Sequence, residues 1–410
     1  MKAVKLKKCR VCSNEHLEKV LDLGNQELTG VFPDNVDNKV TEGPLRLVFC
    51  DVCGLLQLDH SYSLDEMYGM NYGYRSGLNV SMVNHLRNKA IFLQNKYSLN
   101  QGDIVVDIGS NDGTTLNSYS CKGLIKIGFD PTGVKFKKFY NEDINLIPNF
   151  FSSDAYFRIT DKPAKVVTSL SMFYDLEAPI DFAKQVEKIL SIDGVWHLEQ
   201  SYMPTMLRQN SYDTVCHEHL EYYSLSVIKY IVEASGMRII DVGTNDVNGG
   251  SFCVTVAKEK SKYKSNEEII QWMLNCEIRQ ELMTKKPYLE FARNVYVQKD
   301  NFLCLLDSLS KSGKKIFGYG ASTKGNVILQ YCGISTKQMK TIVEVNCDKF
   351  GKYTPKTHIP IVSEEIIKQE KPDYLVVLPW HFRNMILKKE HEYLTTGGKI
   401  IFPLPYTEVV

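Results

Sequence analysis

Short apolar runs rich in β-branched residues alternate with longer amphipathic stretches through the middle of the chain. Runs such as 104–108 have the length of a buried strand, whereas 179–191 places its apolar residues at helical spacing. The pattern predicts strands at 104–108, 125–130, 165–169, 194–199, 236–242 and 251–257, and helices at 81–97, 179–191 and 224–236. This alternation indicates an α/β fold with a mostly parallel sheet and a hairpin-like end.

A second alternation occupies the carboxyl-terminal third. Residues 263–312 are charged and helical in pattern, which is typical of a connecting helical region. A strand, a glycine loop and a helix follow over 314–329, and further strands are expected at 341–345, 373–378 and 398–402. Single cores stop growing near roughly 250–300 residues, so a chain of 410 residues is expected to contain two or three domains.

Composition and charge exclude several classes of protein. Lys and Arg number 49 against 48 Asp and Glu, a net charge of +1, so no polyelectrolyte character draws the chain to nucleic acid. No apolar window approaches the ~18 residues of a bilayer-spanning helix, and the first residues lack the apolar stretch of a secretory signal. We therefore expect a cytoplasmic protein with no nucleic-acid or membrane partner, whose 11 cysteines form no disulfide framework.

Four of those cysteines form two Cys-x-x-Cys pairs, Cys9 with Cys12 and Cys50 with Cys53. Such a turn directs two thiolates at one centre, and two turns complete the tetrahedral set that structural zinc prefers. The long separation of the pairs predicts a strand-rich insertion at 17–49. A redox pair or plain buried thiols are the alternatives. Because all four positions are cysteine, no position stays open for water, and the metal is expected to stabilise the fold without taking part in chemistry.

A glycine-containing loop follows the strand at 104–108. Asp107 precedes Gly109 and Gly113, and Asp130 follows the next strand. Glycines let the backbone approach a ligand, and an acid after the second strand accepts hydrogen bonds from ribose hydroxyls. The G-x-x-x-G spacing differs from the GxGxxG of dinucleotide folds and resembles the loop under S-adenosylmethionine in class I methyltransferases. An ordinary strand-to-helix connection without a ligand is the alternative.

The densest group of ionisable residues lies at 212–223, in YDTVCHEHLEYY. His217 and His219 are two residues apart, which excludes the HExxH zinc motif, although on an extended stretch they could share a face and hold a catalytic metal. A histidine beside a carboxylate, here Glu218, can instead act as a general base. Such a base fits carbon-acid chemistry, because a proton must leave the carbon beside a carbonyl before a methyl is added, and tyrosine hydroxyls can hold the enolate. A solvated polar loop is the remaining alternative.

Two further regions have the composition of ligand loops. The segment 68–76, YGMNYGYRS, is either a lid over a methyl donor or an aromatic loop packed on the sheet. Gly318 and Gly320 precede a helix start with Lys324, which can hold a phosphate but lacks the spacing of an ATP-binding P-loop. The basic, aromatic loop at 348–360 could close on a nucleotide diphosphate, or could be a solvated connector.

Together these motifs resemble the sugar C-methyltransferases of deoxysugar and O-antigen pathways, over essentially the whole chain. CRVC and CDVCGLLQL are similar to that family's zinc-binding module, VVDIGSNDGTTL to its S-adenosylmethionine loop and YDTVCHEHLEYYSL to its catalytic segment. FGYGASTKGN and GKYTPKTHIPI are similar to its carboxyl-terminal half.

The resemblance implies three domains: a small zinc-binding module at 1–65, a class I methyltransferase Rossmann-like domain at 66–262 and a second Rossmann-like domain for a sugar nucleotide at 263–410. It implies S-adenosylmethionine and structural zinc as cofactors, and no nicotinamide. The implied substrate is a nucleotide-linked 4-keto deoxysugar. A monomer or small homo-oligomer is expected.

By the same resemblance His219 removes the proton beside the ketone, and the methyl then transfers to that carbon, expected to be C3. Tyr174 stands where some family members have a histidine, and Cys216 where several have a tyrosine. An O- or N-methyltransferase, a binding protein with a vestigial site and an oxidoreductase are the alternatives. The predicted catalytic residues are Tyr74, Tyr174, His217, Glu218 and His219; the predicted cofactor contacts are Tyr72, Asp107, Gly109, Asn111, Gly113, Asp130 and Ser169; the predicted sugar-nucleotide contacts are Arg75, Lys324, Asn326, Lys352, Tyr353 and Lys356.

Overall fold

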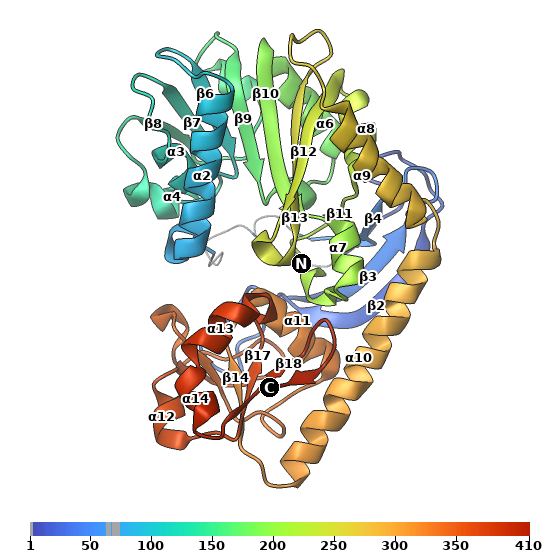
Figure 1. The fold of residues 1–410 in the computed structure, drawn as a ribbon, viewed down its shortest axis with the longest axis vertical. Helices are drawn as coiled ribbons and strands as arrows, with labels where there is room; N and C mark the ends of the chain where they lie inside the picture. The colour runs from blue at the N-terminus through green and yellow to red at the C-terminus, as the bar shows by residue number, and fades with distance from the viewer. Residues whose placement is uncertain (1–2, 63–66, 68–73) are drawn as a thin grey trace.

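Three β-sheets and one long helix organise the molecule (Figure 1). The computed structural model describes residues 3–62, 67 and 74–410. A seven-stranded sheet forms the upper part of the view and a six-stranded sheet the lower part, with the strands of the N-terminal sheet between them. Within these described residues, no helix is both long and apolar enough to cross a membrane.

The N-terminal sheet is antiparallel, with the order β11-β4-β3-β2. In β3 the side chains of Leu45, Leu47 and Phe49 point inward at every second position and are buried, as expected for a strand with one core face. The strands are β2 (Glu18–Glu27), β3 (Glu42–Phe49), β4 (Leu56–Leu58) and β11 (Glu221–Tyr222), with a separate pair of β1 (Val4–Lys5) and β5 (His60–Ser61). The insertion expected at 17–49 is thus formed by β2 and β3, whereas β11 comes from the ionisable segment 212–223, for which the sequence predicts no strand.

The seven-stranded sheet has the order β12-β13-β10-β9-β6-β7-β8, and β13 is antiparallel to both of its neighbours. All five residues of β6 are buried, as in a parallel sheet that helices cover on both faces. The strands are β6 (Ile104–Ile108), β7 (Ile125–Phe129), β8 (Ile144–Ile147), β9 (Ala164–Leu170), β10 (Leu190–Ser201), β12 (Met237–Asn245) and β13 (Ser251–Lys258). The six predicted strands are present, and β8 was missed because it is short, partly exposed and at the edge.

Helices cover both faces of this sheet (Figure 1). They are α2 (Val80–Lys96), α3 (Thr114–Asn117), α4 (Gly133–Phe136), α5 (Ser153–Phe157), α6 (Pro179–Ile189) and α8 (Leu225–Glu233). The short helix α7 (Met203–Arg208) lies beyond the edge of the sheet, where it contacts α10 and the turn at Tyr212–Thr214. Short 3₁₀ turns lie in the loops at the carboxyl edge: η3 (Phe173–Asp175), η4 (Tyr212–Thr214) and η5 (Val247–Gly249).

The carboxyl-terminal sheet has the order β16-β15-β14-β17-β18-β19, parallel except for β19. Its strands are β14 (Ile316–Tyr319), β15 (Ile342–Glu344), β16 (Ile361–Ser363), β17 (Tyr374–Val377), β18 (Lys399–Phe402) and β19 (Glu408–Val409). Its helices are α11 (Thr323–Cys332), α12 (Ile366–Glu370), α13 (Arg383–Lys389) and α14 (His391–Thr395), and α9 (Glu267–Arg279) and α10 (Lys286–Lys311) connect it to the seven-stranded sheet. The predicted second Rossmann-like unit is therefore present.

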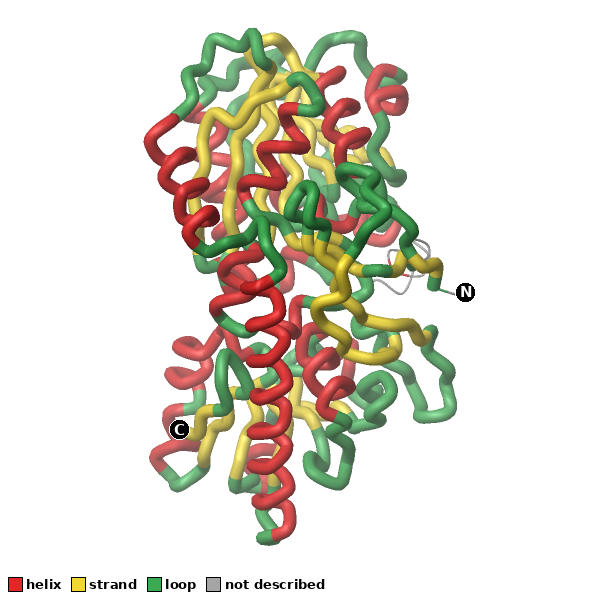
Figure 2. The backbone as a smooth tube through the Cα atoms, turned by 90° about the vertical axis from the view of Figure 1, so that its right-hand side faces the viewer, coloured by secondary structure: helices red, strands yellow, loops and turns green. Residues whose placement is uncertain are grey.

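One hydrophobic core joins the N-terminal sheet, the segment 203–222 that follows β10, and the carboxyl-terminal sheet. It contains Leu47 from β3, Leu220 from the segment before β11, Phe302 from α10 and Ile342 from β15, each fully buried. Figure 2 shows α10 running along the side of the carboxyl-terminal sheet as the longest helix of the described chain. The arrangement of the parts is thus set by apolar packing as well as by the connecting helix.

The carboxyl ends of β14 and β17 face the methyltransferase-like part. Trp380, after β17, donates from Nε1 to Oδ2 of Asp213 in η4 over 2.8 Å. Lys324, at the start of α11, donates from Nζ to the carbonyl of Asn248 in η5 over 2.9 Å. Open α/β sheets bind ligands at this edge, so the segment 212–223 lies opposite the ligand edge of the second sheet.

Glu277 of α9 anchors the connecting region to the seven-stranded sheet. Its buried carboxylate accepts hydrogen bonds from the backbone N–H groups of Leu225 (2.6 Å) and Ser226 (2.9 Å), and from the Tyr202 hydroxyl (2.7 Å). These backbone donors belong to the first turn of α8, which leaves N–H groups without helical partners. The carboxylate supplies both the acceptors and a negative charge at the positive end of the helix dipole.

We predict that Glu277→Ala lowers the free energy of unfolding by about 3 kcal/mol, because it strands buried donors that are paired with a charged acceptor. Glu268→Ala changes an exposed carboxylate of the same helix and should shift stability by less than about 0.5 kcal/mol. Denaturant unfolding followed by circular dichroism measures both. Equal stability of the two variants would contradict the anchoring role.

Candidate functional site

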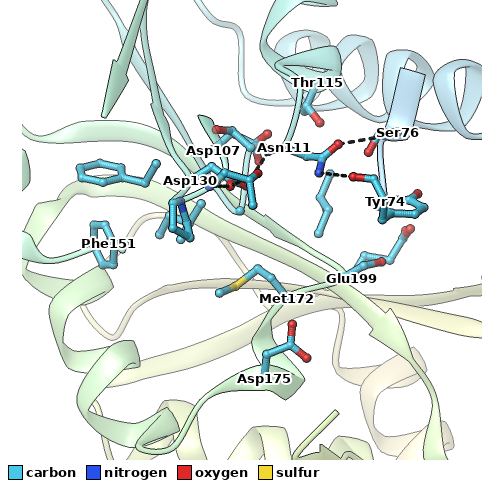
Figure 3. A pocket seen from close by; sticks show the side chains of 18 of the residues that line it. Tyr74, Ser76, Asp107, Asn111, Thr115, Asp130, Phe151, Met172, Asp175 and Glu199 are labelled. Atoms are coloured by element: carbon cyan, nitrogen blue, oxygen red, sulfur yellow. Dashed lines mark hydrogen bonds between the residues drawn. The ribbon is translucent and has the colours of Figure 1, made fainter. Parts of the chain in front are cut away.

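A cavity of about 230 Å³ lies at the carboxyl edge of β6, β7 and β9 (Figure 3). Its wall includes the predicted residues Asp107, Gly109, Asn111 and Asp130, together with Tyr74. Asp107 belongs to β6, Gly109, Asn111 and Asp130 belong to the loops after β6 and β7, and Tyr74 precedes the 3₁₀ turn at Ser76–Leu78. The residues of β6, β7 and their loops meet because the carboxyl ends of neighbouring parallel strands share one edge. The structure therefore brings most of the predicted cofactor residues together.

The loop after β6 has the backbone conformation that its glycines permit. Gly109 has φ of 76°, and a Cβ there would lie 2.9 Å from Cγ of Met172 on the opposite wall. Asn111 donates from its backbone N–H to Oδ2 of Asp130 over 2.7 Å, and its side chain bonds the backbone of Ser76 and Tyr74. Figure 3 shows these contacts from the loop to both sides of the cavity. The loop is thus held open against its neighbours rather than collapsed into the cavity.

Two acids of the cavity have pKa values above their ordinary range. Burial raises the pKa of Asp107 to about 7, although the Thr168 hydroxyl, which donates over 2.5 Å, opposes the shift. Burial also raises the pKa of Asp130, opposed by donors from Thr132 and Asn111. An acidic side chain at the end of the second strand can accept hydrogen bonds from ribose hydroxyls, as the sequence predicted for Asp130.

The other predicted cofactor residues have different surroundings. Gly113 begins α3 with φ of 76°, and a Cβ there would lie 2.8 Å from Tyr140, so it shapes the loop from behind the cavity. Ser169 is fully buried and accepts from Trp196 Nε1 over 3.1 Å, in the core. Arg75, which the sequence predicted as a sugar-nucleotide contact, lies with its guanidinium 4.1 Å from the centre of the Phe139 ring. Tyr72 lies outside the described residues.

Sequence reasoning missed an ionic group in the same wall. Glu199, at the end of β10, is bonded by His85 Nε2 over 2.5 Å, by Lys89 Nζ over 2.8 Å and by Asn245 over 2.9 Å. Burial alone would raise the pKa of Glu199, but His85 and Lys89 lower it to about 2. Its position at the end of a predicted strand, like that of Asp130, was the available signal.

His219 lies in the segment between η4 and β11, next to the loop that lines the cavity. Its Nδ1 is 2.9 Å from the carbonyl oxygen of Thr214, an atom that can only accept, so Nδ1 carries the proton and Nε2 is the acceptor. The ring packs on Tyr174 of η3 with centroids 4.3 Å apart, and Met172 and Asp175 of the same loop line the cavity. Burial lowers the pKa of His219 to about 4, which keeps the imidazole neutral near pH 7.

The two neighbours of His219 face the N-terminal sheet. His217 is fully buried, 3.4 Å from the Gly43 carbonyl through Nε2 and edge-on to Tyr62 with ring centroids 4.7 Å apart. Glu218 lies against Gly30, where a Cβ would be 2.9 Å from Oε1, and burial raises the pKa of Glu218. The segment is a turn at 217–218 and not extended. The two imidazoles therefore have different neighbours, and no group of close metal ligands among the described residues includes them.

The predicted sugar-nucleotide residues divide between two places. Lys324 lies at the ligand edge of the carboxyl-terminal sheet, where Gly320 has φ of 82° and a Cβ would lie 2.7 Å from Pro379. The others contact the zinc-binding module instead: Asn326 bonds the Thr29 carbonyl (2.7 Å), Lys352 pairs with Asp34 (3.3 Å), the Tyr353 N–H bonds the Pro33 carbonyl (2.9 Å) and Lys356 bonds the Asn25 carbonyl (2.7 Å). The loop 348–360 thus fastens the carboxyl-terminal sheet to the module.

Four thiols of the N-terminal module form one cluster. The Sγ atoms of Cys9 and Cys53 are 3.5 Å apart, as are those of Cys12 and Cys50, and all four lie within 4.8 Å of one another. Zinc–sulfur bonds of 2.3 Å in a tetrahedron separate sulfurs by roughly 3.8 Å, so the cluster fits the ion. Burial, then the Cys50 thiol and the charge at Cys9, raise the pKa of Cys12 to about 11, and a bound zinc ion would favour the thiolate form that coordinates it.

We predict that chelation of zinc unfolds the N-terminal sheet, because structural zinc contributes on the order of 10 kcal/mol in small zinc domains. Cys12→Ala should have the same effect, whereas Cys304→Ala, which changes an exposed thiol of α10, should not. Thermal unfolding with and without chelator, together with the zinc content, measures this. A metal-free preparation with an unchanged unfolding temperature would contradict the structural role.

Comparisons with known proteins agree with this architecture. Residues 9–68 match a family described as a zinc binding domain, residues 83–242 one described as a methyltransferase domain, and residues 246–405 one described as a C-methyltransferase C-terminal domain. The C-methyltransferase NovU of Streptomyces niveus is 30% identical over 406 residues, which cover 98% of this chain and 96% of that protein.

Solved structures of other methyltransferases are more distant. The mitomycin 7-O-methyltransferase MmcR is 13% identical, with a TM-score of 0.35 over 44% of this chain and 55% of that one. The cyclopropane synthase MmaA2 of Mycobacterium tuberculosis is 13% identical, with a TM-score of 0.33 over 42% and 83% of the two chains.

The sheet order, the glycine loop and the cavity define a class I methyltransferase that uses S-adenosylmethionine, with a structural zinc in its N-terminal module. More narrowly, the chain belongs to the sugar C-methyltransferase family. The family, the fold class and both cofactors predicted from the sequence are confirmed. The match to NovU also establishes an enzyme that methylates carbon.

Proposed function

We propose that the protein methylates a nucleotide-linked 4-keto deoxysugar at the carbon next to the ketone, C3, in the synthesis of a deoxysugar or a surface polysaccharide. In this proposal the cavity lined by Asp107 and Asp130 holds S-adenosylmethionine, and the sugar lies between that cavity and the ligand edge of the carboxyl-terminal sheet. S-adenosylmethionine, when bound, supplies the electrophilic methyl group.

The tautomer of His219 is the observation that carries the proposal. Because Nδ1 donates to the Thr214 carbonyl, Nε2 of the neutral ring is free to accept a proton from carbon. A C–H group beside a ketone becomes nucleophilic only when that proton leaves, so transfer to carbon needs such a base. The loop 171–177 links His219 to the cavity and supports the proposal, since Met172 lines the cavity and Tyr174 packs on the ring.

Hydroxyl groups near His219 can hold the charge of the enolate. A second, small cavity is lined by His219, Tyr174, Thr214 and Tyr222. The Tyr222 hydroxyl is buried and has no hydrogen-bond partner among the described residues. A preorganised donor of this kind stabilises negative charge that develops in the transition state. We assign the same role to Tyr174, and assign Tyr74, at the cofactor cavity, to the sugar side of the methyl donor.

The carboxyl-terminal sheet offers a place for the nucleotide diphosphate. Ser322 caps α11 by accepting from the Gly325 N–H over 2.9 Å, so the first turn of this ten-residue helix presents its positive end at the ligand edge. Lys324 is at that turn and reaches the methyltransferase side through the Asn248 carbonyl. A phosphate bound there would place the attached sugar toward the segment that carries His219.

Replacement of His219 by Asn should reduce turnover by about 10²–10⁴-fold and leave S-adenosylmethionine binding unchanged, because the base acts on the sugar and not on the cofactor. The assay uses dTDP-, GDP- and CDP-linked 4-keto-6-deoxyhexoses and locates the new methyl by NMR. His391→Asn, in exposed α14, is the matched control. Near-normal turnover of His219→Asn would overturn the assignment of the base, and a methyl found on oxygen or nitrogen would overturn C-methylation of the sugar.

The low pKa of His219 predicts an unusual pH dependence. The base is active when neutral, and its pKa of about 4 lies below the ordinary value of 6.5, so protonation inactivates the free enzyme only in more acidic solution. We therefore expect His219 to contribute no acid limb between pH 8 and about pH 5 to kcat/KM for the sugar, measured with saturating S-adenosylmethionine so that titration of Asp107 in the cofactor cavity does not enter. An acid limb centred near pH 6.5 would show that the histidine is solvated in the working enzyme.

A further inference from the structure

Arg10 lies inside the first zinc knuckle, between Cys9 and Cys12, and its side chain is only 1% exposed. Within its own module the guanidinium donates to the Leu58 carbonyl (2.7 Å), the His60 carbonyl (3.1 Å) and the Ser61 hydroxyl (3.0 Å). A planar guanidinium that donates in several directions is fixed in position. The knuckle that holds the metal thus also fixes one buried cation.

The Nε edge of the same guanidinium faces the methyltransferase domain. Nε donates to Oε2 of Glu177 over 3.0 Å and lies 3.8 Å from Oε1 of Glu221. Glu177 lines the cofactor cavity, at the end of the loop that carries Tyr174. Glu221 is the first residue of β11, two residues after His219, and lines the small cavity beside that ring. One side chain of the zinc-binding module therefore touches both walls of the site.

The carboxyl group of Glu221 has few polar partners. Its side chain is fully buried, and neither carboxylate oxygen has a hydrogen-bond partner among the described residues. Burial raises the pKa of Glu221 well above its ordinary range and the charge of Arg10 opposes this shift, so removal of Arg10 leaves a buried carboxyl group with no cation to stabilise its ionised form. Arg10 is the cation within ion-pair distance of Glu221 in the described chain.

The two acids are also linked through the backbone. The N–H of Leu220, just before Glu221, donates to the carbonyl of Tyr174 over 2.9 Å. Movement of the loop 171–177 would therefore shift the strand that follows His219, and movement of that strand would shift the loop. Arg10 contacts the same two segments through Glu177 and Glu221, and the rings of Tyr174 and His219 form a further contact between them.

We propose that Arg10 is a positioning residue of the active site, through which the zinc knuckle sets the loop 171–177 of the cofactor cavity and the strand behind the catalytic base. The zinc-binding module is then part of the catalytic apparatus and not a separate stabilising domain. The assignment of the base rests on the proposed function, whereas the effect on the cofactor cavity does not. The test therefore begins with S-adenosylmethionine and needs no sugar.

Holoenzyme variants Arg10→Met and Glu177→Gln, and the double variant, are compared with the wild-type enzyme by calorimetric binding of S-adenosylmethionine. We expect each single change to weaken binding about tenfold and the double variant to be no weaker than Arg10→Met, because both remove the same contact. Zinc content and thermal unfolding show which variants are folded. Arg46→Met, which removes a half-exposed arginine of the same module, is the control and should change binding less than about twofold.

Two results would overturn the proposal: binding within twofold of the wild-type value in zinc-loaded Arg10→Met, or fully additive losses in the double variant. If Arg10→Met does not fold, Glu177→Gln alone decides, since its carboxylate is 42% exposed and its loss leaves no buried charge in the loop. Arg10→Met/Glu221→Gln removes both members of the buried pair and should recover turnover with the nucleotide sugar relative to Arg10→Met, by a rise in kcat with little change in KM. Equal turnover of these two variants would contradict the claim that Arg10 positions the strand that follows His219.

Discussion

Backbone pairing between β11 and β4 joins the segment that carries His219 to the zinc-binding module. Glu221 and Tyr222 pair with Gln57 and Leu56, and without them β4 would be a buried edge whose N–H and C=O groups lack partners. The pairing fixes the backbone two residues after the imidazole, while the Thr214 carbonyl fixes the ring itself. The position of His219 thus depends on a strand that completes another domain's sheet.

This dependence explains how the three sheets contribute to the site. The Cys₄ cluster closes the module and leaves no open coordination position, so zinc acts by holding β3, β4 and Arg10 in place. The seven-stranded sheet supplies the cofactor cavity at its carboxyl edge, and the second Rossmann-like sheet turns its own ligand edge toward the same segment. Residues 212–223 therefore contact elements of all three parts: they pair with β4, bond Trp380 after β17 and bond Tyr174 after β9.

Burial determines the protonation of the ionisable groups around residues 212–223. It lowers the pKa of His219 and His217 to about 4 and raises that of Glu218, so these groups are kept close to neutral where water is excluded. Where a charge is retained, as at Glu199, a histidine and a lysine compensate for it. The same interior can hold a neutral histidine, which could accept a proton from carbon. It can also hold ion pairs that position the segments around that histidine.

The sequence by itself determined the α/β class, both Rossmann-like units, the zinc ligands and the cofactor loop, because each is encoded locally by apolar period, Cys-x-x-Cys spacing or glycine position. It placed Asp107 and Asp130 at one edge, since strand ends predict that edge. It could not separate His217 from His219, because their different neighbours, Gly43 and Tyr174, lie 174 and 45 positions away in the chain. It likewise assigned Lys352 and Lys356 to a ligand, whereas packing of the carboxyl-terminal sheet directs them to Asp34 and the Asn25 carbonyl. Only the tertiary structure decided the long-range contacts of Arg10, Glu221 and β11. No local sequence pattern specifies which acid will pair with a buried arginine, or which strand will pair with the edge of a sheet.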